Sequence, residues 1–208
     1  IALSQHYKKY RDRDVLKYIK IYLDFIGFCQ QPDGRFLNYV DVNKNFTTQN
    51  DNENLEDSSG RAMWALGYIV SLTGILPAEF TDKAETIFQK SLSLTKNMYS
   101  TRAMAFVIKG LYYYNRKVKD ADTLIYIKLF ADRLVQMYRH EADENWRWFE
   151  GYLTYANSVL PEALLLCYTI TGSEVYKNVA KESFDFLLEN TFDEHSIKII
   201  SNRSWLVK

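Results

Sequence analysis

The stretch LEDSSGRAMWALGYIVSL at residues 55–72 most constrains what this chain can fold into. It opens with carboxylates and hydroxyls, and after Gly60-Arg61 it is apolar on nearly every side of a helix. A helix that is apolar all round is typical of the middle of a protein, where neighbouring helices cover several of its faces. The sequence therefore predicts a buried central helix that begins near Ser58.

Two later stretches repeat this plan. TRAMAFVIKGLYYY occupies residues 101–114, and NSVLPEALLLCYTITG occupies residues 157–172. The first of these shares an Arg-Ala-Met step with the central stretch, and the second ends in Thr-Gly, the same pair that directly follows the central stretch at Thr73-Gly74. We interpret the three apolar stretches as the inner helices of one repeating all-helical array.

Four amphipathic stretches alternate with the apolar ones. Each repeats its apolar residues at i, i+3 and i+4, a spacing that is typical of a helix with one buried side. They are expected as helices at about residues 14–30, 78–96, 121–141 and 173–189. Alternation of half-buried and fully buried helices is what two layers require. The sequence therefore predicts an all-α fold, a helical-hairpin array, in which residues 1–208 form a single domain.

The loops of this array differ in length according to which end of an inner helix they join. Short links follow the inner helices, whereas long segments precede them, at residues 31–57, at 142–156 and, as a tail, from 190 onward. Short strands are expected inside two of these segments, at residues 35–39 and 197–201. In an array of helices that run alternately up and down, loops of one kind lie on one face. We therefore expect the long loops to converge at the N-terminal ends of the inner helices, and function concentrates on such loops.

Composition argues against several classes of partner. Lys plus Arg and Asp plus Glu both number 26, so the formal net charge is zero and no basic stripe indicates nucleic acid. No apolar run is long enough to cross a bilayer, so no membrane span is expected. The three histidines are scattered, and no phosphate-binding glycine loop is present, so neither a metal nor a cofactor is expected. A soluble protein is expected, in a compartment that the sequence leaves open.

The first candidate cluster follows the first amphipathic helix. Asp33-Gly34 is a turn signal, and Arg35 comes directly after it. Asp33 and Arg35 are candidates for substrate binding. The alternative is a plain turn that leads into a strand, because Asp-Gly is such a common turn pair.

The second cluster is EDSSGR at residues 56–61, with Trp64 close behind it. One residue among 57–59 is expected to cap the central helix, because Asp and Ser accept hydrogen bonds from the first backbone N–H groups. That leaves a neighbouring carboxylate for chemistry. Arg61 either pairs with a carboxylate in a structural ion pair or contacts substrate, and the same alternatives hold for Arg102 in the second inner helix. Arg61, Trp64 and Arg102 are candidates for substrate binding.

The segment WRWFEGYLTYAN at residues 146–157 crowds large aromatic side chains around one glutamate. An aromatic face stacks on the C–H bonds of a sugar ring while carboxylate and amide groups bind its hydroxyls, and pockets mix such walls with a few polar groups. The alternative is a structural plug whose rings belong to the core. The candidates for substrate binding in this segment are Trp146, Trp148, Tyr152, Tyr155 and Asn157.

Paired carboxylates are the recurring tool of glycoside hydrolysis, in which one protonates the leaving oxygen while the other activates water or attacks. The carboxylates on the expected face are Asp33, Glu56, Asp57, Glu150 and Glu162. We take Glu56, Asp57 and Glu150 as the catalytic candidates. An oligosaccharide or polysaccharide is therefore the expected partner.

Several of these motifs resemble those of a known family. DGRF at residues 33–36, EDSSGRAMWALG at 56–67, WRWFE at 146–150 and LPEAL at 160–164 are similar to segments of the six-hairpin glycosidase superfamily. The similarity is greatest to uncharacterised bacterial proteins described as glycosyltransferase-associated. It implies an (α/α)6 toroid with a carbohydrate site on the face described above, in a bacterial cytoplasm or periplasm.

The helix count bears on how much of a toroid is present. Seven helices are expected, or about three and a half helical hairpins. A complete toroid has six hairpins, so this chain is expected to form a partial toroid. The leading hypothesis is a carbohydrate-active, glycoside hydrolase-like protein. The alternative is a non-catalytic helical-repeat module that binds glycan or protein, and a sugar epimerase or lyase is a third, since one fold hosts several chemistries.

Overall fold

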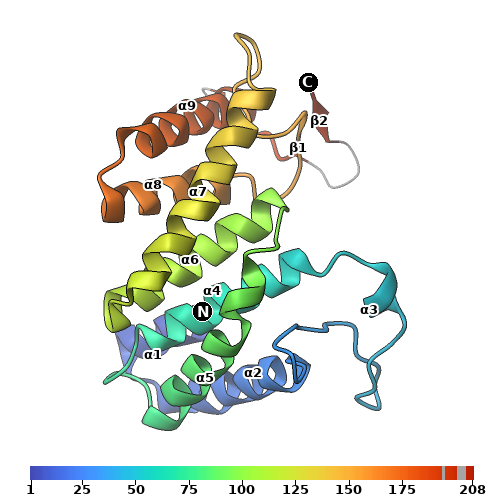
Figure 1. The fold of residues 1–208 in the computed structure, drawn as a ribbon, viewed down its shortest axis with the longest axis vertical. Coiled ribbons are helices and arrows are strands. Elements are labelled where there is room, and N and C mark those ends of the chain that lie inside the picture. The colour runs from blue at the N-terminus through green and yellow to red at the C-terminus, as the bar shows by residue number, and fades with distance from the viewer. Residues whose placement is uncertain (194, 201–204) are drawn as a thin grey trace. The chain divides into compact units, whose positions relative to one another are not determined.

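The computed structural model describes residues 1–193, 195–200 and 205–208, and in this part of the chain the fold is all-α (Figure 1). The described residues form nine α-helices, one 3-10 helix and two short strands. The α-helices are α1 (Ala2–Tyr10), α2 (Leu16–Cys29), α3 (Gln49–Asn52), α4 (Glu56–Val70), α5 (Ala78–Thr95), α6 (Thr101–Val118), α7 (Ala121–Glu141), α8 (Val159–Thr171) and α9 (Glu174–Thr191). The other elements are η1 (Arg13–Val15), β1 (Tyr152–Leu153) and β2 (Leu206–Val207). None of the helices in the described ranges combines the length and apolarity needed to cross a lipid bilayer.

Two compact units divide the chain, residues 1–124 and residues 125–208. We describe each unit by itself and call them unit 1 and unit 2. The prediction that the chain is a single domain stays a prediction. Following the two layers expected from the sequence, we call α4, α6 and α8 the inner helices and α2, α5, α7 and α9 the outer helices.

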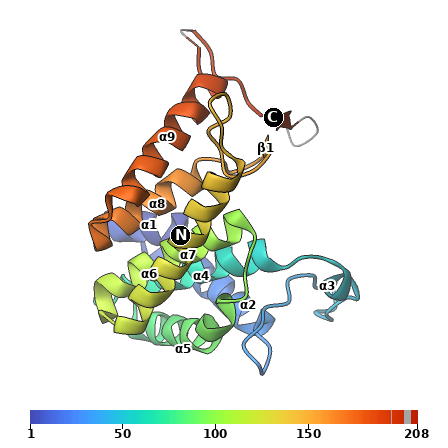
Figure 2. The ribbon, with the colours of Figure 1, turned by 45° about the horizontal axis from the view of Figure 1, so that its top comes forward.

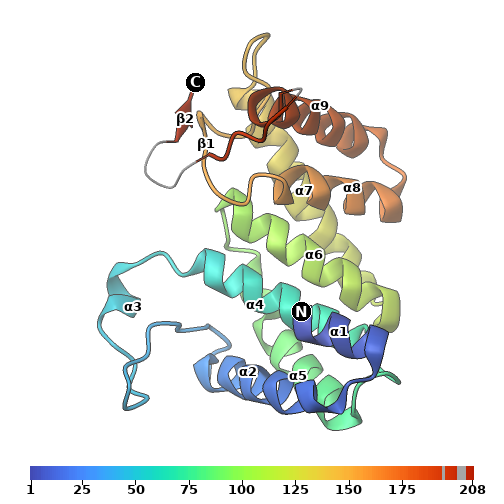
Figure 3. The same cartoon turned by 180° about the vertical axis from the view of Figure 1, so that it is seen from behind.

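The inner helices of unit 1, α4 and α6, lie backbone to backbone (Figure 3). A Cβ atom added to Gly60 would lie 2.7 Å from the carbonyl oxygen of Ala103, and one added to Gly67 would lie 2.1 Å from that of Gly110. The contacting residues are 43 positions apart in both cases, so the two helices run parallel. Glycine is what permits so close an approach, because any side chain there would push the helices apart.

The outer helices of unit 1 also run parallel to each other. Lys83 on α5 forms an ion pair with Asp24 on α2 at 2.6 Å, 59 residues apart. Gln30, directly after α2, donates to the carbonyl oxygen of Ile87, 57 residues apart. The two offsets are nearly equal, as parallel helices require. They exceed the offset of the inner pair because the long 31–55 segment lies between α2 and α4.

In unit 2, the outer helices α7 and α9 are joined by two hydrogen bonds from tyrosines to carboxylates. Tyr176 donates to Asp132 at 2.7 Å and Tyr138 donates to Glu182 at 2.9 Å, each across 44 residues. The constant offset again means parallel helices. The inner helix α8 packs against α9 (Figure 2). Strands β1 and β2 pair antiparallel, with Tyr152 opposite Val207.

Several details differ from the sequence-based expectation. Helix α1 was not predicted, because its apolar stripe is weak, and neither was the single turn of α3. The strand predicted at residues 35–39 is wrong, since only an isolated bridge joins Phe36 to Gln30. Ile197 likewise forms only a bridge, to Phe192, in place of the strand predicted for 197–201. The final residue of that prediction, Ser201, lies outside the described residues.

The predicted cap of the central helix is also wrong. Helix α4 begins at Glu56, earlier than expected, so residues 57–59 lie inside its first turn. The side-chain oxygen of Asn54 instead accepts the backbone N–H of Glu56 at 2.8 Å. The N-cap residue is Leu55, which makes no side-chain capping bond, so no capping residue in the sequence marks the true start of the helix.

Candidate functional site

The N-terminal ends of α4 and α6 meet, as expected for parallel inner helices. The side chain of Glu56, the first residue of α4, accepts the backbone N–H groups of Tyr99 at 2.9 Å and Ser100 at 2.6 Å. Ser100 is the residue before α6, so one carboxylate oxygen of Glu56 ties the two helix starts together. The predicted meeting of inner-helix N-terminal ends is confirmed for these two helices, while the convergence of the long loops stays a prediction because only one of those loops, residues 31–57, belongs to unit 1. For α8, which belongs to unit 2, the meeting stays a prediction.

A pocket of about 320 Å³ opens beside this junction, within unit 1. Its walls come from the 31–55 segment, the first turns of α4, the end of α5 and the turn before α6. The polar residues that line it are Arg35, Asn50, Asp51, Glu56, Ser59, Ser91, Thr95 and Asn97. The apolar residues that line it include Phe36, Leu37, Leu55, Met63, Leu94 and Met98. Apolar walls with a few polar groups are typical of small-molecule pockets, and this volume is at the small end of their range, ~300–1,000 Å³.

The wall formed by the 31–55 segment is held by one buried asparagine. The side-chain oxygen of Asn50 accepts the backbone N–H groups of Asn38 and Tyr39, both at 3.0 Å. Its side-chain nitrogen donates to the carbonyl oxygens of Tyr39 at 2.8 Å and Thr47 at 3.0 Å. These four bonds give an otherwise irregular segment a defined path. Sequence reasoning missed Asn50, because nothing distinguishes it within a run of Asn, Asp, Thr and Gln.

Asp33 and Arg35 form the turn that begins this segment. Gly34 has a φ of +94°, and a Cβ there would lie 2.4 Å from the carbonyl oxygen of Lys90, so the turn requires glycine. Asp33 accepts the backbone N–H of Arg35 at 3.0 Å and its Nε at 2.6 Å, and these hydrogen bonds hold the pKa of Asp33 below its usual value. The plain-turn alternative thus describes the backbone well, while Arg35 also lines the pocket.

Asp57 and Arg61 form an ion pair on the first turns of α4, with 2.7 Å between the Asp57 carboxylate and Arg61 Nε. The pair is partly exposed, and the Arg61 guanidinium lies 4.3 Å from the centre of the Phe106 ring on α6. Of the two alternatives for Arg61, the structural ion pair is therefore present. Arg102 is buried at 4% exposure, and its Nη1 lies 3.4 Å from the Thr101 hydroxyl.

Trp64 packs in the seam between α4 and α6 rather than into the pocket. Its ring stacks on Phe106, with centroids 5.6 Å apart, and Lys109 Nζ lies 3.9 Å from the ring centre. Within the described residues, the Trp64 indole N–H is buried without a hydrogen-bond partner. Lys109 is itself buried at 4% exposure. Sequence reasoning missed Lys109, although a single lysine inside an apolar helix is a visible signal.

In unit 2, the two tryptophans of the aromatic segment are buried. Trp146 packs edge-on against Phe186 and donates its indole N–H to the carbonyl oxygen of Glu150 at 2.7 Å. Trp148 is fully buried and packs edge-on against Phe149. A ring with no exposed face offers nothing for a sugar to stack on. Burial of both indoles supports the structural-plug alternative for this part of the segment.

The remaining residues of the aromatic segment lie differently. Tyr155 is 42% exposed, so one of the predicted stacking rings is accessible. The Asn157 side chain is buried and exchanges hydrogen bonds with the backbone of Thr154, both at 3.1 Å, which makes it a turn-forming residue. Tyr152 lies in β1, with its ring 4.9 Å from that of Trp205. Glu162 is in the first turn of α8.

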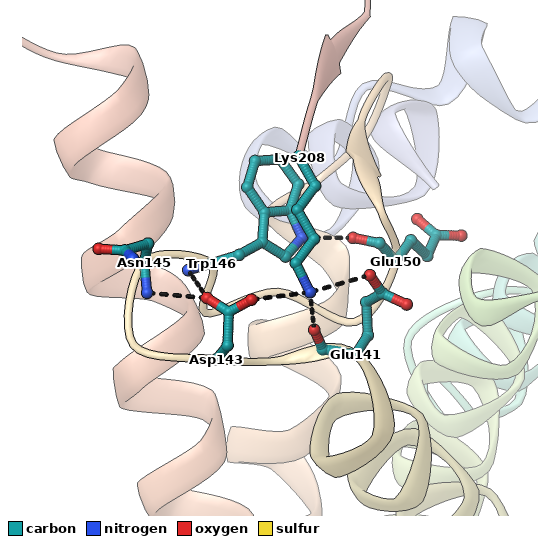
Figure 4. A network of polar contacts seen from close by, with 6 residues as sticks. All are labelled: Glu141, Asp143, Asn145, Trp146, Glu150 and Lys208. Atoms are coloured by element: carbon teal, nitrogen blue, oxygen red, sulfur yellow. Dashed lines mark hydrogen bonds and ion pairs between the residues drawn. The ribbon is translucent and has the colours of Figure 1, made fainter.

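A polar network that the sequence did not predict joins Lys208 to residues just before the 146–157 segment (Figure 4). Lys208 Nζ lies 2.9 Å from the Asp143 carboxylate and donates to the carbonyl oxygen of Glu141 at 2.6 Å. The lysine lowers the pKa of Asp143, which also accepts the backbone N–H groups of Asn145 and Trp146. Figure 4 shows the Glu150 carboxylate directed away from this network, with only its backbone carbonyl engaged there.

Comparison of the chain with protein families, with curated proteins and with solved structures finds no match. The resemblance to six-hairpin glycosidases therefore stays a prediction. Within residues 1–193, 195–200 and 205–208, no group of three or more His, Cys, Asp or Glu side chains is placed to hold a metal ion.

Proposed function

We propose that this chain is a carbohydrate-active protein of glycoside hydrolase-like type, and that a short saccharide binds in the pocket beside the junction of α4 and α6. The observation that carries the proposal is the pocket itself, which lies beside the N-terminal ends of α4 and α6 and joins apolar walls to carboxylate, amide and hydroxyl groups. Such a lining matches a sugar, whose ring has apolar C–H faces and whose edge carries hydroxyls.

The charges around the pocket favour a neutral ligand. Asp51 and Glu56 are the acidic groups of the lining, and Arg35 is its basic group. Arg35 is already paired with Asp33, so little positive charge remains for a phosphate or a carboxylate on the ligand. A phosphorylated or acidic sugar would meet net repulsion, whereas a neutral saccharide would exchange its hydroxyl–water hydrogen bonds for bonds to the lining.

If the protein is an enzyme, Glu56 is the proposed carboxylate for the reaction in unit 1, with Asp57 and Glu150 as the further candidates. One oxygen of Glu56 already accepts two backbone N–H groups, so the other oxygen is the one proposed to face the ligand. Hydrolysis needs a second carboxylate within about 5–10 Å of the first.

The non-catalytic binding module remains the second candidate, because both catalytic candidates in unit 1 have structural roles. Glu56 ties two helix starts together and Asp57 is paired with Arg61. A carboxylate so engaged is less available to transfer a proton, but it still binds hydroxyls as an acceptor.

The test is to change Glu56→Gln, Asp57→Asn and Glu150→Gln singly and to measure saccharide binding by calorimetry and turnover with a panel of neutral oligosaccharides. Glu53→Gln, an exposed change in the same loop, is the matched control. Loss of turnover with retained binding supports an enzyme, and weaker binding without any turnover in the wild type supports the binding module. The proposal fails if no neutral saccharide binds the wild type, or if Glu56→Gln folds and matches the wild type in both saccharide binding and turnover.

A further inference from the structure

Helix α2 carries an exposed row of large apolar side chains. The row consists of Tyr18, Ile21, Tyr22, Phe25 and Phe28, whose exposed fractions range from 42% to 63%. These positions are spaced at i, i+3, i+4, i+7 and i+10, so they form one continuous stripe of the helix surface. We call this stripe the α2 row. Soluble monomers rarely leave so large an apolar patch in contact with water, and such patches mark interaction sites.

The α2 row lies on the side of its helix turned away from α5. Asp24 and Gly27 are the residues of α2 that contact α5, through Lys83 and Ile87. At 100° per residue, Tyr18, Tyr22 and Phe25 lie on roughly the opposite side of the helix. Ile21 and Phe28 lie at the edge of the row nearer to Asp24, and Phe28 stacks on Phe46 of the 31–55 segment with ring centroids 5.1 Å apart.

Pockets flank the α2 row on both sides, all within unit 1. One of about 420 Å³ is bounded by α1, α2 and α4 and includes Tyr22 in its wall. Two others, of about 260 and 490 Å³, have Phe25 in their walls and are bounded on the far side by the 31–55 segment. The lining of the 260 Å³ pocket is almost entirely apolar, and that of the 420 Å³ pocket is mostly apolar. The surface thus offers a ridge of rings and, beside it, hollows that rings of the same kind would fill.

The spacing of the row is nearly the same in both directions along the helix. Counted from a centre at Leu23, Tyr18 and Phe28 are equally far away, and so are Ile21 and Phe25. Two copies of α2 crossing antiparallel at this centre would therefore set Tyr18 against Phe28 of the other copy and Ile21 against Phe25. A self-complementary patch of this kind is what a two-fold symmetric dimer requires.

We propose that the α2 row is the interface of a symmetric homodimer, in which α2 of one copy packs antiparallel on α2 of the other. Tyr22 lies next to the two-fold axis, and the rings of each copy enter the pockets beside the row of its partner. Four rings of ~150–250 Å² each, about half exposed, offer on the order of 300–500 Å² per copy. Ile21 and the pocket walls add to this, which brings the area toward the roughly 600–800 Å² per partner of a specific interface.

The first experiment is sedimentation velocity over a range of concentrations with the wild type, Ile21→Asp and Ile125→Asp. Ile21 and Ile125 are matched, at 60% and 64% exposure, but Ile125 lies on α7 outside the row. Wild type and Ile125→Asp are expected to reach twice the 24.5 kDa mass of the chain. Ile21→Asp is expected to weaken dimerisation by about tenfold or more, because it buries a charge at the interface core.

A second measurement tests the proposal even if the Ile21→Asp variant is unstable. Tyr22→Cys is expected to give a disulfide-linked dimer under mild oxidation, since the two cysteines would face each other across the axis, whereas Ile125→Cys is not. The native Cys29 and Cys167 are buried and serve as an internal background. The proposal is overturned if the wild type stays monomeric at all concentrations, if Ile21→Asp dimerises like the wild type, or if Tyr22→Cys does not cross-link.

Discussion

The inner pair of unit 1 and the outer pair of unit 2 both run parallel with almost the same sequence offset, but different interactions hold each pair together. Helices α4 and α6 run parallel with an offset of 43 residues, and α7 and α9 run parallel with an offset of 44. The inner pair touches through glycines and backbone carbonyls. The outer pair is joined at a distance by tyrosine hydroxyls that reach carboxylates.

This difference shows how one repeat length is maintained in two layers. The inner helices are buried on several sides, so their spacing is set by steric contact, and an extra methyl group there has no room. The outer helices keep one side in water, so long polar side chains can span the gap between them. Changes in the inner pair should therefore act through volume, and changes in the outer pair through lost hydrogen bonds.

The largest expected effect comes from Gly67→Ala. The added Cβ would lie 2.1 Å from the carbonyl oxygen of Gly110, so α4 and α6 must separate, at a cost of about 3 kcal/mol or more in the free energy of unfolding, the upper end for overpacking. Urea denaturation followed by circular dichroism measures it. Gly151→Ala is the control, because its Cβ would meet only the Glu141 side chain at 3.5 Å. Equal stability of the two variants would mean that glycine contact does not set the inner spacing.

The second effect is that of Tyr176→Phe, which removes the hydroxyl that donates to Asp132. Loss of a hydrogen-bond donor to a partly buried carboxylate lowers the free energy of unfolding by about 1.5–3 kcal/mol. A double-mutant cycle with Asp132→Asn measures the coupling between the two side chains. The comparison predicts a clear coupling energy, and strictly additive effects would show that the bond does not join α7 to α9.

A third, smaller effect is a loss of stability in alkali. Burial raises the pKa of Tyr138 and of Tyr176 well above the usual value for tyrosine, and the neighbouring carboxylates add to this. Above about pH 10 the unfolded chain releases these protons while the folded chain keeps them, so stability falls as the pH rises. The fall is at most ~1.4 kcal/mol per pH unit for each tyrosine. Unfolding measured from pH 8 to 11 should be less pH-dependent in Tyr138→Phe, and an unchanged slope would contradict the assignment.

The smallest effect is expected for the Asp57–Arg61 pair. It is partly exposed and spaced i, i+4 on one helix, so Asp57→Asn should change the free energy of unfolding by only about 0.3–0.5 kcal/mol. Thermal denaturation at low and high salt measures it, and the difference from wild type should shrink as salt increases. A change comparable to that of Gly67→Ala would mean that this pair has a structural role beyond surface charge.

Much of the helical frame could be predicted from sequence. The all-apolar run after Gly60 and the amphipathic stretches between such runs fixed α2 and α4–α9 to within a few residues. The heptad spacing of Gly60 with Gly67, and of Ala103 with Gly110, was visible, but its meaning required knowing that these helices touch.

The candidate site was less predictable because it depends on contacts between distant residues. Glu56 was singled out as a catalytic candidate, which stays a prediction, and its bonds to residues 99 and 100 could not be foreseen because they follow from the parallel packing alone. Trp146 and Trp148 illustrate the opposite problem, since a row of aromatic residues does not reveal which rings point inward. Lys208 forms ion pairs with Glu141 and Asp143, which lie 65 residues or more before it, and no local sequence pattern predicts such a pairing.

The central claim, that the inner helices α4 and α6 run parallel and bring their N-terminal ends together, is tested most directly by distances between spin labels. One label is placed at Glu53, before α4, and the second either at Asn97, before α6, or at Lys117, near its end. The 18 residues of α6 extend over about 27 Å. The account predicts that the 53–97 distance is the shorter by roughly 20 Å, and a shorter 53–117 distance would contradict it.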